Sequence, residues 1–407
     1  MWARKSASEP NKPQTRSRIQ RVADGVSRRR QACWVRALQQ HSLGQITMQH
    51  LLKGCALALA VGLSSGAPQA AEKVILDTDF NVINDDGQAF IMLAQLHAQK
   101  KIELLGMTLV SGNAWVDQEQ VDALKAVERM GVEKEVGVYS GAAYPLLHDF
   151  ATYPQEQALY GTGWSGAFQS PRPTSAAQWV APPDGLATHT RLRSETAPQF
   201  IIDSVRKNPH EVTLLAIGPL TNLALAIRQA PDIVPLIKRI VYMGGAIEVP
   251  GNTTPAAEFN WWFDPEAAKI VLRSPIEHVI FPNDVCEKLI FDATIYQRVI
   301  AAQGAVAQLY KSVFGPEFAK DPGYHSFTWD TLPTLFLSEP EIVTESRDMW
   351  IDVDTHFGPD YGRALGYKKG APVGTQKAKV VFAVNQEKFW DGYVSLLTLP
   401  TPVKSPR

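Results

Sequence analysis

The chain has 407 residues, of which 45% are hydrophobic and 20% are charged, a composition that excludes a disordered or fibrous protein. Its length is sufficient to bury a large hydrophobic core. The charge is unevenly distributed, because residues 1–47 carry ten Lys and Arg residues but only two acidic ones, Glu9 and Asp24. We therefore predict that residues 1–47 form a disordered basic extension.

Residues 48–71 have the layout of a secretory signal peptide. Lys53 precedes an apolar run over residues 55–63, and small residues then lead to a cleavage site near Ala70 or Ala71. A transmembrane anchor is disfavoured, because the run is too short to span a hydrocarbon core of roughly 30 Å. We interpret Met48 as the true start of the protein, and a long extension ahead of the signal is the alternative.

The mature domain is predicted to cover residues 72–407 and to have no membrane contact after cleavage. Its acidic residues outnumber Lys and Arg by about ten, which argues against a nucleic-acid partner, because phosphate binding requires positive charge. Cys286 is its single cysteine, so no disulfide can form within it. Export without disulfides indicates a secreted protein of a bacterial periplasm or exterior, stabilised by packing and metal.

Apolar, β-rich runs alternate with amphipathic segments along the mature domain. The expected strands cover residues 72–76, 102–110, 211–218, 239–245 and 278–284, and the expected helices cover residues 87–99, 116–131 and 221–229. This alternation predicts an α/β fold with one doubly wound, mostly parallel sheet flanked by helices. Ligand groups are then expected at the carboxyl ends of the strands.

Two segments lack apolar periodicity and are predicted to be surface loops that act as lids. The first is rich in Gly, Pro and Ser and covers residues 153–183, and the second covers residues 315–328. Long loops in a compact domain commonly border a functional site.

Four carboxylates follow the first predicted strand in the sequence VILDTDFNVINDD, namely Asp77, Asp79, Asp85 and Asp86. Such crowding is repulsive unless a cation neutralises it, and oxygen ligands without His or Cys favour Ca²⁺ or Mg²⁺. The alternatives are an exposed acidic turn with helix-capping carboxylates and a dehalogenase-type phosphatase. The phosphatase motif requires Thr or Val where this chain has Asn81, and it leaves the second acidic pair unexplained.

The segment DTDFNVINDD resembles the N-terminal signature of the nucleoside hydrolase family, with a slightly longer loop than in the commonest members. The resemblance implies that Asp79 and Asp86 bind Ca²⁺ and that Asp79 is the general base on a metal-bound water. It further implies that Asp85 binds ribose hydroxyls and that Asp77 is a buried orienting carboxylate.

Two further matches follow in the expected order. LVSGNAW supplies Asn113 at a position where the family lines the ribose site. GPLTNLALA resembles the family segment whose Thr carbonyl completes the calcium shell, which implies a main-chain ligand at Thr221. A Thr at the start of a helix is by default an N-cap, so Thr221 alone carries little weight.

The segment YMGGAIEVPGNTTPAAEFNWWFDPEAA resembles the ribose-binding segment of the family most closely. The resemblance assigns four residues to the sugar, namely Met243, Asn252, Glu258 and Asn260. Amides and a carboxylate suit this role, because they bind both the protons and the lone pairs of vicinal hydroxyls. A polar turn between strand and helix is the alternative interpretation.

The last metal ligand implied by the resemblance is Asp330, in TWDTLPTLF. Broad or pyrimidine-accepting members have His before this Asp as the leaving-group acid, whereas this chain has Trp329. Purine-preferring members are more similar, because they stack the base between tryptophans, so Trp329 is assigned to base departure and Trp164 to the opposite face of the base. Structural packing is the alternative for both tryptophans.

Five more residues are candidates for lesser roles: Tyr324 and His325 as proton donors, Trp261 and Trp262 at the edge of the pocket, and Asp284 behind it. The sequence thus predicts calcium-dependent hydrolysis of the N-glycosidic bond of ribonucleosides, preferably purine nucleosides, by a homodimer or homotetramer. A periplasmic nucleoside-binding protein without turnover is the alternative from a different class.

Overall fold

The structure is a computed structural model that describes residues 71–403. The predicted basic extension (1–47) and signal peptide (48–71) therefore lie outside the described residues, except for Ala71, which directly precedes the first strand.

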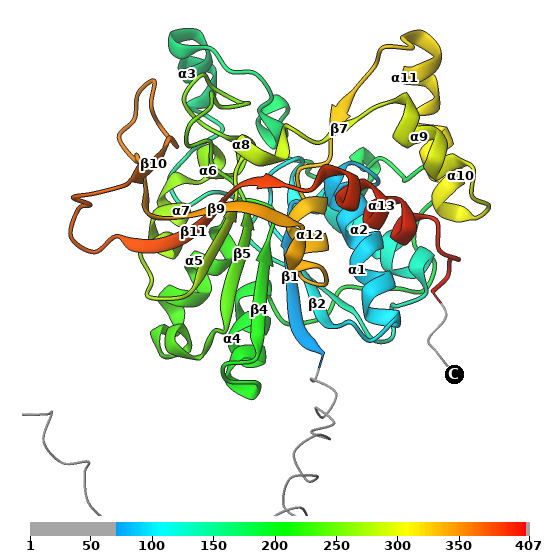
Figure 1. Cartoon of the computed structure of the whole chain (residues 1–407), viewed down its shortest axis with the longest axis horizontal. Coiled ribbons are helices and arrows are strands. Elements are labelled where there is room, and N and C mark those ends of the chain that lie inside the picture. Colours follow the sequence, from blue (N-terminus) through cyan, green and yellow to red (C-terminus); the bar gives the residue numbers. More distant parts are fainter. Residues whose placement is uncertain (1–70, 404–407) are drawn as a thin grey trace, which may run out of the picture. The chain divides into compact units, whose positions relative to one another are not determined.

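A nine-stranded sheet forms the centre of the described domain (Figure 1), with the strand order β10-β9-β11-β6-β5-β4-β1-β2-β3. Neighbouring strands pair in parallel, except that β9 is antiparallel to both β10 and β11. The strands of this sheet are β1 (Glu72–Thr78), β2 (Ile102–Leu109), β3 (Gly137–Ser140), β4 (Val212–Ala216), β5 (Arg239–Met243), β6 (His278–Phe281), β9 (Val343–Val353), β10 (Ala364–Tyr367) and β11 (Gln376–Val384).

The predicted mostly parallel α/β fold is confirmed, and the five predicted strands correspond to β1, β2, β4, β5 and β6. Strand order reverses beside β1, because the chain runs outward through β2 and β3 on one side and through β4, β5 and β6 on the other. A ligand site is expected at such a reversal, at the carboxyl ends of the strands.

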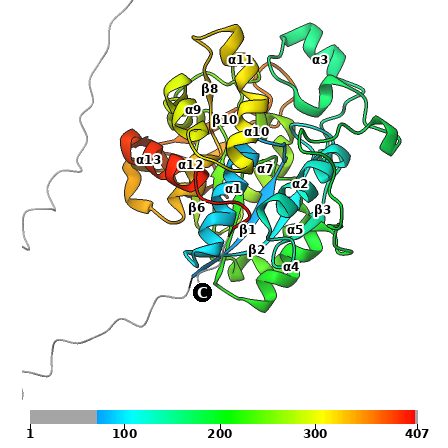
Figure 2. The same ribbon diagram turned by 90° about the vertical axis from the view of Figure 1, so that its right-hand side faces the viewer.

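Helices cover both faces of the sheet, as Figures 1 and 2 show. Side chains of α1, α2, α9, α10, α12 and α13 belong to the hydrophobic core of one face, and those of α4, α5 and α7 belong to the core of the other. The helices are α1 (Asp85–Ala98), α2 (Val116–Met130), α3 (Tyr153–Tyr160), α4 (Ala197–Lys207), α5 (Thr221–Gln229), α6 (Phe259–Phe263), α7 (Pro265–Leu272), α8 (Asn283–Cys286), α9 (Ala293–Ile300), α10 (Ala305–Val313), α11 (Gly315–Lys320), α12 (Thr331–Phe336) and α13 (Gln386–Leu397).

Strand β1 shows why these segments fold as buried strands. Val74 and Leu76 pack into the core of the first face, whereas Ile75 packs into the core of the opposite face, and all three are fully buried. Side chains alternate between the faces of a sheet, so a continuous apolar run is what a strand covered on both faces requires. Among the helices of residues 71–403, none is both long and apolar enough to cross a bilayer.

The two predicted lid loops contain regular structure. Residues 153–183 include α3, and residues 315–328 include α11 and the strand β8 (Ser326–Phe327), which pairs with β7 (Ile290–Phe291). Figure 1 shows α3 and α11 beyond the same end of the central sheet. Helix α3 depends on tertiary contacts that periodicity does not reveal, since Glu156 is buried and accepts a hydrogen bond of 2.8 Å from Trp262 Nε1.

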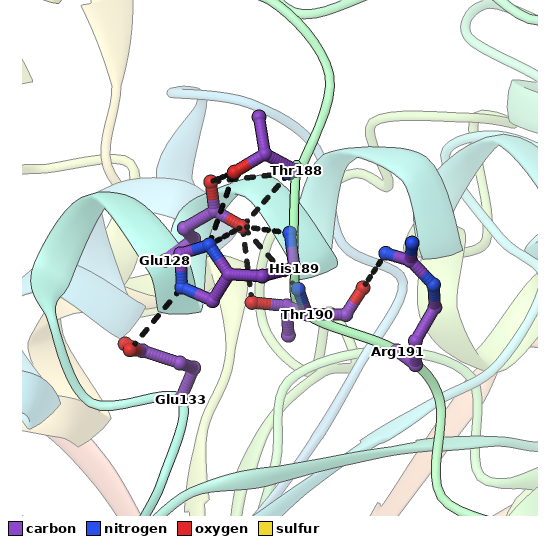
Figure 3. Close-up of polar contacts among 6 residues, drawn as sticks. All are labelled: Glu128, Glu133, Thr188, His189, Thr190 and Arg191. Carbon is purple, nitrogen blue, oxygen red and sulfur yellow. Dashed lines mark hydrogen bonds and ion pairs between the residues drawn. The ribbon is translucent and has the colours of Figure 1, made fainter.

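Residues 188–190, which lie between the first predicted lid segment and α4, are hydrogen-bonded to Glu128 of α2 (Figure 3). The carboxylate of Glu128 accepts hydrogen bonds from Thr188 Oγ1 at 2.7 Å, from Thr190 Oγ1 at 3.1 Å and from the main-chain N–H of His189 at 3.3 Å. Burial opposes ionisation of Glu128, but these hydrogen bonds outweigh it and lower its pKa to about 2. These hydrogen bonds hold the segment that leads to α4 against α2.

Candidate active site

Three carboxylates from distant parts of the chain meet at the carboxyl end of β1. One oxygen each of Asp85, Asp86 and Asp330 lies within 4.8 Å of the others. Asp85 and Asp86 open α1, and Asp330 precedes α12 without capping it through its side chain. The predicted convergence of Asp86 with Asp330 is confirmed, and Asp85, predicted as a sugar ligand, is the third member of this acidic cluster.

The acidic cluster is electrostatically unfavourable without a cation. Burial raises the pKa of Asp330 well above its ordinary value, and the charges of Asp85, Asp86 and Asp79 raise it further. The pKa of Asp86 is raised in the same way, and burial raises that of Asp85 to about 6. A bound divalent ion would relieve this repulsion.

Asp79 lies beside the acidic cluster and is 1% exposed. Its Oδ2 accepts the main-chain N–H of Asn113 at 2.8 Å. Gly112 and Gly218 pack directly on it, since a Cβ at Gly218 would lie 2.7 Å from Asp79 Oδ1 and a Cβ at Gly112 would overlap Oδ2. Both glycines are thus required by the close approach of the backbone to this carboxylate.

Asn113, predicted to line the ribose site, also organises the acidic loop. Its side-chain Nδ2 donates to Asp86 Oδ2 at 2.8 Å and to the carbonyl oxygen of Asp79 at 3.1 Å. Glu119, which the sequence did not single out, supports this loop from α2 by accepting the N–H of Ala114 at 3.2 Å. Glu119 is fully buried, and burial and then Asp79 raise its pKa well above the ordinary value.

Asp77 is buried behind the cavity, as predicted, and does not line it. Its Oδ1 accepts hydrogen bonds from Thr108 Oγ1 at 2.5 Å and from Asn222 Nδ2 at 2.8 Å, while Oδ2 has no partner. Burial raises its pKa to about 7.

The raised pKa of Asp77 leads to a pH-dependent stability. Between about pH 4 and pH 7 the folded state retains a proton that the unfolded state releases, so Asp77 makes the free energy of unfolding fall as pH rises. Asp77→Asn removes this titrating group. In the metal-free protein, the free energy of unfolding should then fall less steeply with pH, by up to about 1.4 kcal/mol per pH unit. Urea unfolding at several pH values measures the slope, and identical slopes for both proteins would contradict the assignment.

The predicted ribose segment lines the same cavity. Glu258 caps α6 by accepting Asn260 N–H at 2.7 Å, and it also accepts Gly245 N–H at 2.8 Å. Asn252 Oδ1 accepts the N–H of Phe259 at 2.9 Å. These hydrogen bonds orient the side chains, and burial raises the pKa of Glu258 to about 7.

One cavity of about 600 Å³ collects most of the predicted residues. It has a polar end formed by the acidic loop and the ribose segment, and an aromatic wall formed by the segments around α9–α11 and the loop after α3. The predicted residues among its lining are Asp79, Asp85, Asn113, Trp164, Met243, Asn252, Glu258, Asn260, Tyr324, Trp329 and Asp330. Lining residues that the sequence analysis missed include Gln88, Ile217, Glu287, Phe291, Phe314 and Phe327.

Thr221, the predicted main-chain ligand, does not line the cavity. It begins α5, and its hydroxyl donates to Asp264 Oδ2 at 2.6 Å. Ile217, four residues earlier and directly after β4, lines the cavity instead, and its carbonyl oxygen accepts Asn260 Nδ2 at 3.0 Å. The structure therefore places Ile217, at the strand end, in the cavity lining and Thr221 outside it.

Of the residues predicted for lesser roles, only Tyr324 lines the cavity. Trp261 and Trp262 are fully buried and pack in two different cores, so they do not edge the pocket. His325 is exposed outside the lining, whereas Tyr324 lines the cavity. Asp284 lies behind the cavity and orients the loop after β5, because its carboxylate accepts the N–H groups of Ile247 at 2.9 Å and Glu248 at 2.7 Å.

Comparison with known proteins agrees with this geometry. The profile of the family described as inosine-uridine preferring nucleoside hydrolase matches residues 74–391. The pyrimidine-specific ribonucleoside hydrolase RihB of Escherichia coli strain SE11 is 30% identical over 325 residues, which cover 78% of this chain and 94% of that protein.

Solved structures give the same assignment of the fold. The plant nucleoside hydrolase PpNRh1 superposes with a TM-score of 0.65 at 22% identity, over 81% of this chain and 99% of that one. The purine-preferring ribonucleoside hydrolase from Gardnerella vaginalis superposes with a TM-score of 0.63 at 25% identity, over 80% of this chain and 98% of that one. The family profile and the similarity to RihB identify the chain as an N-glycosyl hydrolase. The chain belongs to the inosine-uridine preferring nucleoside hydrolase family.

Proposed function

We propose that this protein hydrolyses the N-glycosidic bond of purine ribonucleosides, giving ribose and the free base, with Ca²⁺ as its cofactor. The observation that supports this most strongly is one cavity that joins a carboxylate cluster to an aromatic wall. The polar end suits a sugar with vicinal hydroxyls, and the aromatic wall suits a planar base.

The side chains fit a hard divalent cation. Asp85, Asp86 and Asp330 offer oxygens within 4.8 Å of one another, which is compatible with a common ion at the 2.3–2.6 Å that is usual for Ca²⁺. The carbonyl oxygen of Ile217 is an additional candidate ligand at the same strand ends. When bound, Ca²⁺ would acidify a coordinated water and bind sugar hydroxyls.

The residues of the chain supply the remaining chemistry. Asp79, buried beside the acidic cluster with a raised pKa, accepts the proton of the attacking water. Glu258, Asn252 and Asn260 fix the sugar, so that positive charge can develop on its ring as water approaches the anomeric carbon.

The purine preference is proposed from the aromatic wall. Trp329 and Trp164 line the cavity together with Phe291, Phe314 and Phe327. The larger face of a purine gains more from stacking on aromatic side chains than that of a pyrimidine. The relatives differ in this respect, because the RihB protein is named pyrimidine-specific and the Gardnerella protein purine-preferring. The base preference of this chain therefore requires direct measurement.

Release of free base from inosine, guanosine, uridine and cytidine tests the proposal. We expect a larger kcat/KM for the two purine nucleosides, and a preference for uridine or cytidine would reject the proposed specificity. Saturable binding of all four without any product would instead identify a binding protein.

Trp329→Ala should raise KM for inosine by about 5- to 160-fold, because stacking on one aromatic side chain contributes about 1–3 kcal/mol per base. Steady-state kinetics of hypoxanthine release measure the effect. Trp179→Ala is the matched control, since Trp179 is 41% exposed and lies outside the lining of the cavity. An unchanged KM for Trp329→Ala would remove Trp329 from the base site.

We also propose that the protein is exported to the bacterial periplasm, that its mature form begins near Glu72 and that it forms a homodimer or homotetramer. The composition of residues 48–71 supports export.

A further inference from the structure

Glu287 directly follows α8 and lines the active-site cavity. On one side it lies near the Trp329 side chain, whose buried Nε1 has no hydrogen-bond partner among the described residues. On the other side its charge reaches Glu258 and contributes to the raised pKa of that carboxyl. Glu287 is therefore placed where the sugar-binding end meets the aromatic wall.

Glu287 has no cationic partner within the described residues. No Lys, Arg or His nitrogen of residues 71–403 lies within 4.0 Å of its carboxylate, and the adjacent Lys288 donates instead to the carbonyl oxygen of Phe382 at 3.0 Å. The other carboxylates of the cavity are engaged, since Glu258 caps α6 and Asp79 accepts the N–H of Asn113. Asp85 and Asp330 belong to the acidic cluster. The carboxyl of Glu287 thus remains free to bond to a ligand.

The surroundings of Glu287 favour its protonated form. Partial burial raises its pKa, the Trp329 side chain opposes this rise, and Asp284 on the same short helix adds to it. The other titratable groups that line the cavity are Asp79, Asp85, Glu258, Tyr324 and Asp330. A carboxyl in such surroundings carries a proton at higher pH than an exposed Glu does.

We propose that Glu287 is the general acid that protonates the departing nucleobase, an inference that rests on the proposed nucleoside hydrolysis. As the C1′–N bond breaks, its electron pair passes to the base nitrogen, which takes the proton of the Glu287 carboxyl. The attacking water gives its oxygen to C1′ and a proton to Asp79. Release of that proton to solvent and uptake of one by Glu287 complete the cycle, so the net reaction is nucleoside plus water to ribose plus base.

A general acid matters only for a substrate whose leaving group must be protonated. Two substrates that differ in this respect therefore test the role of Glu287. Glu287→Gln should lower kcat for inosine by about 10²–10⁴-fold, the usual contribution of a general acid. Hydrolysis of p-nitrophenyl riboside, whose phenolate leaves without protonation, should change by less than about threefold. The basic limb of the kcat/KM profile for inosine should also disappear.

Glu277→Gln is the matched control, because Glu277 is exposed at the opposite end of β6 and should leave both activities unchanged. Equal losses on the two substrates would overturn the inference, since they would indicate a structural or sugar-binding role, and so would full activity on inosine. A wild-type protein that hydrolyses neither substrate would reject the proposed function itself, and the inference with it.

Discussion

Asp79→Asn is expected to lower kcat for inosine hydrolysis by about 10²–10⁴-fold, the range for loss of a general base. Asp79 lines the cavity, and burial, followed by the charge of Asp85, raises its pKa well above the ordinary value of an Asp. Asn has nearly the same shape and keeps an oxygen that can accept the N–H of Asn113. The variant should therefore lose proton transfer and keep the loop, as steady-state kinetics and a crystal structure can show.

The control for this variant is Asp122→Asn on α2. Asp122 is also buried and its pKa is raised to about 7, but it lies outside the lining of the cavity and accepts a hydrogen bond from Gln118. It should hydrolyse inosine at the wild-type rate. An Asp79→Asn protein that retains wild-type kcat would mean that another group accepts the proton.

Asp330→Asn should abolish the stabilisation by Ca²⁺ without harming the metal-free protein. Removing one of three mutually repelling buried carboxylates should leave the melting temperature of the metal-free protein unchanged or raise it. Wild-type protein should gain about 2.7 kcal/mol at a Ca²⁺ concentration of a hundred times Kd, a shift of several degrees. Calorimetric melting with chelator and with Ca²⁺ compares the two proteins.

The combination of effects distinguishes a metal site from ordinary packing. A packing residue would lower the melting temperature in chelator, whereas a metal ligand lowers only the shift that Ca²⁺ produces. Asp122→Asn should keep the full shift. If Ca²⁺ raised the melting temperature of Asp330→Asn as much as that of the wild-type protein, Asp330 would not be a ligand of the ion.

The sequence predicted the central strands well because each is buried on both faces and forms a continuous apolar run, as Val74, Ile75 and Leu76 do. Strands β9, β10 and β11 were not predicted. Residues 343–348 of β9 are exposed or half-buried, so this strand lacks a continuous apolar run. Helix α3 was read as a loop because its stability depends on contacts with Trp262 rather than on an amphipathic pattern of its own.

The candidate site was predictable where side chains carry the chemistry, and less so elsewhere. Asp86 was identified because carboxylates crowded at a strand end need a cation, and Asp330 was identified through the resemblance to the nucleoside hydrolase family. Ile217 was missed because a main-chain oxygen has no side-chain signature, and the prediction fell on Thr221 instead. Glu287 and Phe314 were missed because only the folded chain brings these distant segments to the cavity.

The most direct test of the central claim is the rate of hypoxanthine release from inosine as Ca²⁺ is returned to chelator-treated protein. If the carboxylates of Asp85, Asp86 and Asp330 hold the catalytic ion, the rate should rise from background and saturate at one Ca²⁺ per chain. A rate that is already maximal in chelator, or that stays at background at every Ca²⁺ concentration, would contradict the claim.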